Sequence, residues 1–136
     1  AALRAAGETR ALVSVLQLRC GLETRAVDRV PLELEVAKAQ EEALGAPELA
    51  FATLAGCVRA APGFEAPRLE LERLARKLGK TRPLVETLQG ALAAATDSEV
   101  AEALERRVAE LLEPLDPEPA RDAWQAVLAR GDGGAE

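Results

Sequence analysis

The sequence contains no histidine, tyrosine, methionine, asparagine or isoleucine, and aromatic residues make up only 2% of its 136 residues. The lack of histidine removes the usual general base at neutral pH and the commonest protein ligand of metal ions. Two cysteines cannot complete a zinc site alone, and no glycine-rich loop is followed by the lysine and helix of a phosphate-binding motif. We therefore predict no enzymatic activity, no catalytic residues, and no cofactor or metal ion.

The two cysteines, Cys20 and Cys57, lie 37 positions apart. A disulfide between them is one alternative, but a lone pair is more typical of reduced, buried thiols, which favours the cytoplasm. No apolar run reaches the roughly 20 residues of a membrane span, and the first residues contain no signal-peptide core. We expect no membrane contact. The chain begins without methionine in helix-like sequence, so we also expect a segment of a longer protein.

Alanine, leucine, glutamate and arginine dominate the composition, and hydrophobic residues account for 49% of the chain. These four are strong helix formers, whereas the β-branched residues are limited to scattered valine and threonine. The length suits one domain with a buried core, so we predict a single all-α domain. The net charge of −6 argues against nucleic acid as a partner, because phosphate neutralisation needs clustered lysine and arginine in excess.

A repeat with an offset of 34 residues runs through the middle of the chain. Leu44-Gly45, followed by Thr53-Leu54 and Gly56, recurs as Leu78-Gly79, followed by Thr87-Leu88 and Gly90. A third copy follows with a spacing of 36, because its apolar residues occupy the same positions of one helical stripe. The stripe residues of the three copies are Ala50, Leu54, Cys57 and Val58; Leu84, Leu88, Ala91 and Leu92; and Ala120, Trp124, Val127 and Leu128.

Each unit divides into two helices. Gly45 and Gly79 supply the positive φ that ends a first helix. Proline just inside each second helix is tolerated, because its missing N–H has no partner in the first turn. Pro31 conflicts with a helix interior, so we expect the first helix of that unit to begin near Val30. The expected helices are 28–44, 47–61, 67–78, 82–95, 98–112 and 118–130, with Pro47, Pro83 and Pro119 near the starts of the second helices.

The resulting domain map has an atypical unit at the N-terminus and a tail at the C-terminus. The first 27 residues form a partial repeat with Gly7 in its turn and Leu12, Leu16, Arg19 and Cys20 on its stripe. The last residues lack an apolar period and are predicted to be flexible. The full map is 1–27 for the partial repeat, 28–62, 63–96 and 97–130 for the repeats, and 131–136 for the tail.

A helix, a glycine turn and a second helix recurring every 34 residues resemble the tetratricopeptide repeat family, over about residues 28 to 130. The resemblance implies a right-handed superhelical α-solenoid of stacked antiparallel helix pairs, with about three repeats. It also implies a protein-interaction scaffold that binds a peptide or a partner protein, with a groove lined by the first helices. The richness in alanine, leucine and arginine is similar to that of bacterial members. Pro62 matches the proline that closes a unit, whereas Thr96 and Asp132 depart from it.

Arg73, Arg76 and Lys77 are the first candidate partner-binding residues, because they share one helical face in the only stretch where basic side chains outnumber acidic ones. An anionic peptide would bind them through charge-assisted hydrogen bonds. The alternative is a solvated face paired with Glu70, Glu72 and acidic neighbouring units.

Trp124, Val127 and Leu128 are the second group of candidates. Trp124 occupies a bulky stripe position, so we predict that it belongs to the core. If no helix follows, however, the outer side of the last helix leaves part of this stripe exposed. Such an open end predicts either a homodimer or continuation of a longer solenoid through the C-terminal helix.

Two function classes follow from these patterns. The first is a protein-interaction module that uses the groove or the open end. The alternative is a helical sensor or regulatory domain that binds a small ligand inside a closed bundle. The 34-residue period favours the interaction module, because a ligand-binding bundle has no reason to repeat its turn glycine, and small-molecule pockets usually contain aromatic side chains.

Overall fold

The computed structural model describes the backbone of residues 2–134 and the side chains of residues 7–130. Over this range the chain is helical and contains no strand, which confirms the predicted all-α class. The elements are α1 (Ala2–Leu22), α2 (Ala26–Lys38), the π-helical turn η1 (Ala39–Ala43), α3 (Pro47–Ala60), α4 (Glu65–Leu78), α5 (Thr81–Ala94), α6 (Ser98–Leu112) and α7 (Pro117–Gly134).

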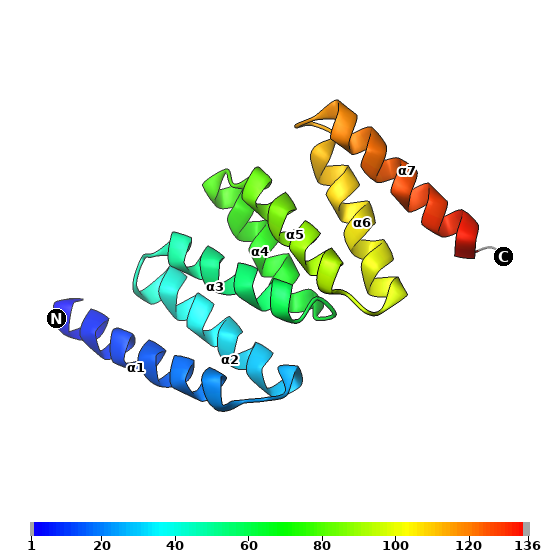
Figure 1. The fold of residues 1–136 in the computed structure, drawn as a ribbon. Coiled ribbons are helices and arrows are strands. Elements are labelled where there is room, and N and C mark those ends of the chain that lie inside the picture. The colour runs from blue at the N-terminus through cyan, green and yellow to red at the C-terminus, as the bar shows by residue number, and fades with distance from the viewer. Residues whose placement is uncertain (1, 135–136) are drawn as a thin grey trace.

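The helices follow one another along an elongated row, with the two termini at opposite ends (Figure 1). Each helix packs mainly on its neighbours in the sequence, and α3 also packs on α5. The terminal helices have neighbours on one side only, because α1 lies on α2 and η1, whereas α7 lies on α6. Both ends of the row therefore offer an outer helix face that the rest of the described chain does not cover.

The helix boundaries in the middle of the chain follow the local signals in the sequence. Gly45 and Gly79 have φ values of 62° and 68°, the left-handed conformation expected of glycines that end helices. Pro47 is the first residue of α3, where its missing N–H costs nothing. Asp97 caps α6, since its carboxylate accepts hydrogen bonds from the backbone N–H groups of Glu99 and Val100.

The start of α2 corrects the expectation based on Pro31. The helix begins at Ala26 and contains Pro31, whereas the proline predicted a start near Val30. The first turn closes ahead of the proline, because the backbone N–H of Arg29 donates to the carbonyl of Arg25 at 3.0 Å. Burial of Val30 and Leu32 on either side of Pro31 offsets the one backbone hydrogen bond that the proline cannot donate.

The two ends of the chain also differ from expectation. Gly7 lies inside the single helix α1, so the predicted turn at Gly7 is wrong. At the other end α7 continues to Gly134, beyond the expected end at Arg130. The predicted tail therefore overlaps α7 as far as Gly134, and its last two residues lie outside the described range.

The largest core cluster runs through the middle of the row. Its most completely buried leucines come from α3, α4, α5 and α6 and are Leu54, Leu71, Leu74, Leu88 and Leu104. The predicted stripe of α3 is fully buried, and that of α5 is buried except for the partly covered Leu92. The stripe of α7 is only partly buried, because no helix follows α7 within the described chain.

Candidate protein-interaction surface

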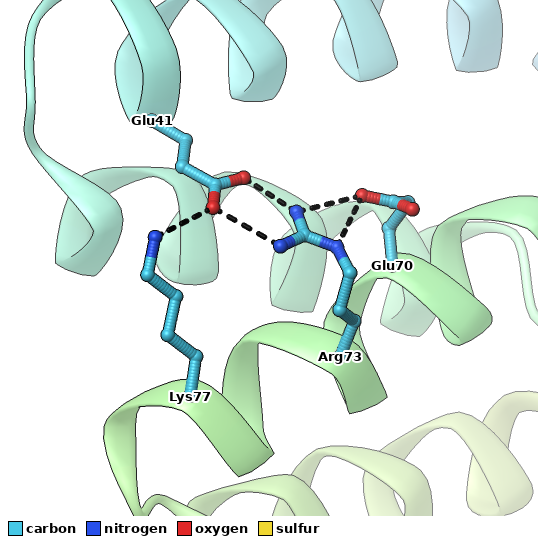
Figure 2. A network of polar contacts seen from close by, with 4 residues as sticks. All are labelled: Glu41, Glu70, Arg73 and Lys77. Atoms are coloured by element: carbon cyan, nitrogen blue, oxygen red, sulfur yellow. Dashed lines mark hydrogen bonds and ion pairs between the residues drawn. The ribbon is translucent and has the colours of Figure 1, made fainter.

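Glu41 links η1 to α4 through two cations (Figure 2). Its carboxylate lies in η1 and accepts hydrogen bonds from the Arg73 guanidinium at 2.5 and 3.1 Å and from Lys77 Nζ at 3.0 Å. Arg73 and Lys77 are four residues apart on α4, so both side chains leave the same edge of that helix. Arg73 also donates to Glu70 at 2.9 and 3.2 Å, which fixes the guanidinium between two carboxylates.

The environment of Glu41 strongly favours its charged form. Its side chain is only 10% exposed, and burial alone would raise its pKa. The hydrogen bond from Arg73, assisted by that from Lys77, outweighs burial and lowers the pKa of Glu41 to about 2. The pairing also raises the pKa of Arg73, so both partners remain ionised at neutral pH.

The predicted basic patch is thus divided between two edges of α4. Arg73 and Lys77 face α2, where their charges are compensated by Glu41 and Glu70. Arg76 instead lines a hollow on the α6 side. The ion pairs with Glu70 and with Glu41 of the neighbouring unit agree with the alternative of a face paired with Glu70 and acidic neighbouring units, although the sequence did not single out Glu41.

A hollow of about 420 Å³ between α4 and α6 collects four arginines and two glutamates. Arg107 binds both glutamates, donating to Glu72 at 2.5 Å and to Glu110 at 2.9 Å. The charged residues lining the hollow are Arg68, Glu72 and Arg76 from α4 and Arg106, Arg107 and Glu110 from α6.

The arginines of this hollow exceed the carboxylates that neutralise them. Arg106 reaches Glu102 only at 3.5 Å. Arg68 and Arg76 form no ion pair with any residue whose side chain is described, and Arg68 Nε is buried without a hydrogen-bond partner. We call Arg68, Arg76, Arg106 and Arg107 the α4–α6 arginine cluster.

Arg73 on α4 and Arg107 on α6 are 34 residues apart, although the stripes of the helices that follow them are offset by 36. Arg73 reaches back from α4 to Glu41, and Arg107 reaches back from α6 to Glu72. The two arginines therefore make the same kind of bridge between successive first helices. The spacing of the two arginines is visible in the sequence. Their acidic partners are not separated by 34 residues, so the period alone could not identify the pairs.

The predicted C-terminal candidates occupy three different environments. Val127 is buried against α6, and Leu128 is 65% exposed. Trp124 is half-buried, between the core position that the stripe predicts and the partial exposure expected where no helix follows. Its indole N–H donates to Glu113 Oε1 at 2.6 Å, which fixes the ring at the junction of α6 and α7. Trp124 and Leu128 are partly exposed because no helix follows α7 within the described chain to cover its stripe.

The larger uncovered apolar face lies at the other end, on α1. Leu12, Val15, Leu18 and Leu22 are 54%, 53%, 71% and 80% exposed. Val13, Leu16 and Cys20 of α1 pack against α2 and η1. The predicted stripe is therefore right for Leu16 and Cys20 and wrong for Leu12 and Arg19, which are exposed. Leu12 was placed on the buried side because α1 carries apolar residues on two faces, and periodicity does not say which face is covered.

The cysteines are suited to packing more than to chemistry. Both are free thiols. Burial, followed by the neighbouring Glu33 carboxylate, raises the pKa of Cys57 well above its usual value, and burial also raises that of Cys20. A raised pKa lowers the fraction of reactive thiolate. Among the residues that the structure describes, no group of three or more histidine, cysteine, aspartate or glutamate residues is arranged to hold a metal ion.

The chain was compared with protein-family models, curated proteins and solved structures. No match was found in any of the three. The similarity to tetratricopeptide repeats therefore rests on the 34-residue pattern alone. Among the described residues, no helix is both long enough and apolar enough to cross a lipid bilayer.

Proposed function

We propose that this chain is a non-catalytic protein-interaction module, a helical solenoid of about three tetratricopeptide-like units that binds an acidic segment of a partner protein. The α4–α6 arginine cluster carries the proposal. It combines an excess of guanidinium groups with a hollow large enough for one or two carboxylate side chains. Arginine suits this task because its planar fork binds a carboxylate with two parallel hydrogen bonds.

The negative net charge of the chain means that only a local excess of cations can bind an acidic segment. A protein with a net charge of −6 repels an acidic peptide on average, so affinity for one requires a local excess of cations. Arg68 and Arg76 supply that excess, because the carboxylates of the hollow are already bound to Arg107. A buried guanidinium N–H without a partner is costly, and Arg68 Nε is such a group beside the hollow.

The repeat architecture is supported by the packing in chain order and by the similar bridges of Arg73 and Arg107, each of which reaches back to a glutamate of the preceding unit. These features also weigh against a closed bundle with an internal ligand. A hollow of about 460 Å³ is bordered by Glu41, Glu70 and Arg73 as well as by aliphatic side chains, and no aromatic side chain lines it. Pockets for small ligands are usually enclosed by apolar and aromatic groups.

Binding of a fluorescein-labelled oligoglutamate peptide, followed by fluorescence polarisation at low salt, tests the proposal. We expect Arg76→Glu to weaken binding by about tenfold or more, since one charge-assisted contact becomes a repulsion. The matched control is Arg121→Glu, which makes the same charge change at an exposed position of α7. If both variants weakened binding equally, the loss would be due to net charge and not to the arginine cluster. If the wild type did not bind the peptide, the proposal would be ruled out.

A further inference from the structure

The hollow that holds the α4–α6 arginine cluster also has an apolar wall. Leu69 of α4 and Ala103 of α6 line it together with the arginines. Leu69 is 52% exposed, so the described chain leaves half of this side chain uncovered beside the guanidinium groups. A segment that binds in the hollow therefore contacts an apolar surface as well as cations, and burying that surface favours binding.

A second hollow, of about 200 Å³, continues the first toward the starts of α4 and α6. The two hollows adjoin, because Arg68 and Ala103 line both of them. We call the two hollows together the α4–α6 groove. The remaining residues that line the second hollow are Pro62, Gly63 and Val100, together with the acidic Glu65 and Glu99.

The charge of the α4–α6 groove reverses along its length. Glu65 and Glu99 are exposed, and neither forms an ion pair with any residue whose side chain is described. They lie in the first turns of α4 and α6, whereas Arg76 lies in the last turn of α4, with Leu69 between the two ends. The distance along α4 from Glu65 to Arg76 is about 16 Å at 1.5 Å per residue, which an extended segment of about six residues covers.

We propose that the α4–α6 groove selects a partner segment whose charge reverses along its length, with acidic residues at the arginine cluster, an apolar residue against Leu69 and a basic residue at Glu65 and Glu99. The arginine cluster holds the acidic end, so this inference rests on the proposed function and adds a direction to it. A uniformly acidic segment places like charges beside Glu65 and Glu99, and that repulsion selects against it. The two ends of the groove also give the segment one favourable orientation, because charges of opposite sign meet only when the acidic end lies at the arginines.

Isothermal titration calorimetry of the full chain at low salt, with three peptides of identical composition, tests the order of charges. Two peptides carry three glutamates, a leucine and three lysines in one order or its reverse (EEELKKK and KKKLEEE), and the third mixes the charges (EKELKEK). All three are acetylated and amidated, so none has a net charge and the −6 of the chain does not distinguish them. We expect the tighter of the two ordered peptides to bind about fivefold or more tightly than the mixed peptide.

Substitutions at the acidic end and at the apolar wall locate the bound segment. Glu99→Lys should weaken the tighter ordered peptide by about fivefold or more and strengthen the binding of oligoglutamate, because the charge at that end is reversed. The matched control is Glu118→Lys, the same change in the first turn of α7, at a residue that lines neither hollow. Leu69→Gln should weaken the ordered peptide by about threefold or more, whereas Leu128→Gln, at a similarly exposed leucine of α7, should leave it unchanged.

The outcomes separate this inference from the proposed function. If oligoglutamate binds through Arg76 but the ordered peptides bind no more tightly than the mixed one, the inference is wrong and the proposed function stands. Equal effects of Glu99→Lys and Glu118→Lys on the ordered peptide would also overturn the inference. If neither oligoglutamate nor any of the three peptides binds, the inference and the proposed function are both wrong.

Discussion

At the scale of single residues, Glu41 links folding to pH. Its pKa is about 2 in the folded chain and near 4.5 when unfolded, because Arg73 and Lys77 stabilise the carboxylate. The stabilisation is complete above about pH 4.5 and is lost as the pH falls through about 2. We therefore expect Glu41→Gln to lower the free energy of unfolding by about 1–2 kcal/mol at pH 7, and the difference from wild type to vanish toward pH 2.

Urea unfolding monitored by circular dichroism measures this difference, since urea does not screen ion pairs. The control is Glu42→Gln, the same change at the adjacent residue, whose exposed side chain has no ion pair within the described chain. It should change the free energy of unfolding by less than about 0.5 kcal/mol. An equal loss in both variants would mean that the geometry of the Glu41 bridge contributes nothing.

At the scale of elements, two glycines have opposite roles. Gly79 ends α4 with φ of 68°, whereas Gly56 lies inside α3, and a Cβ added at either position meets no atom within 4 Å. The effect of alanine on stability at Gly79 and Gly56 therefore depends on the backbone conformation and not on steric contacts. Gly79→Ala should destabilise the protein by about 1–2 kcal/mol, and Gly56→Ala should stabilise it by about 0.5–1 kcal/mol. Thermal unfolding of both variants checks the signs, and a shared sign would contradict the argument.

The helices could be located from the sequence because their boundaries are local events. A glycine in the left-handed conformation, a proline in a first turn or the Asp97 cap acts within a few residues. The α1 face and the partner of Arg73 could not be assigned in this way. Both depend on which surface lies opposite, and that is decided by packing between residues more than thirty positions apart in the case of Glu41 and Arg73.

At the scale of the whole molecule, packing along a row has consequences for cooperativity. Each helix is supported by its neighbours, so the ends have less to lose by opening than the middle, where Leu71, Leu74 and Leu88 are fully buried. The sequence predicted the open C-terminal end but not that the larger apolar surface is on α1. That asymmetry follows from residues outside the clear repeats, where periodicity carries the least information.

The single tryptophan allows this gradient of stability to be measured. Trp124 lies at the α6–α7 junction, so its fluorescence reports that end alone, whereas circular dichroism averages over every helix. We expect the fluorescence transition in urea to precede the circular dichroism transition, because α7 is held chiefly by α6. Glu105→Ala removes the bridge from α6 to Arg130 and should move the fluorescence midpoint lower still, with little change in circular dichroism. Coincident transitions in both proteins would instead mean that the row unfolds as one cooperative unit, with α7 as firmly bound as the central helices.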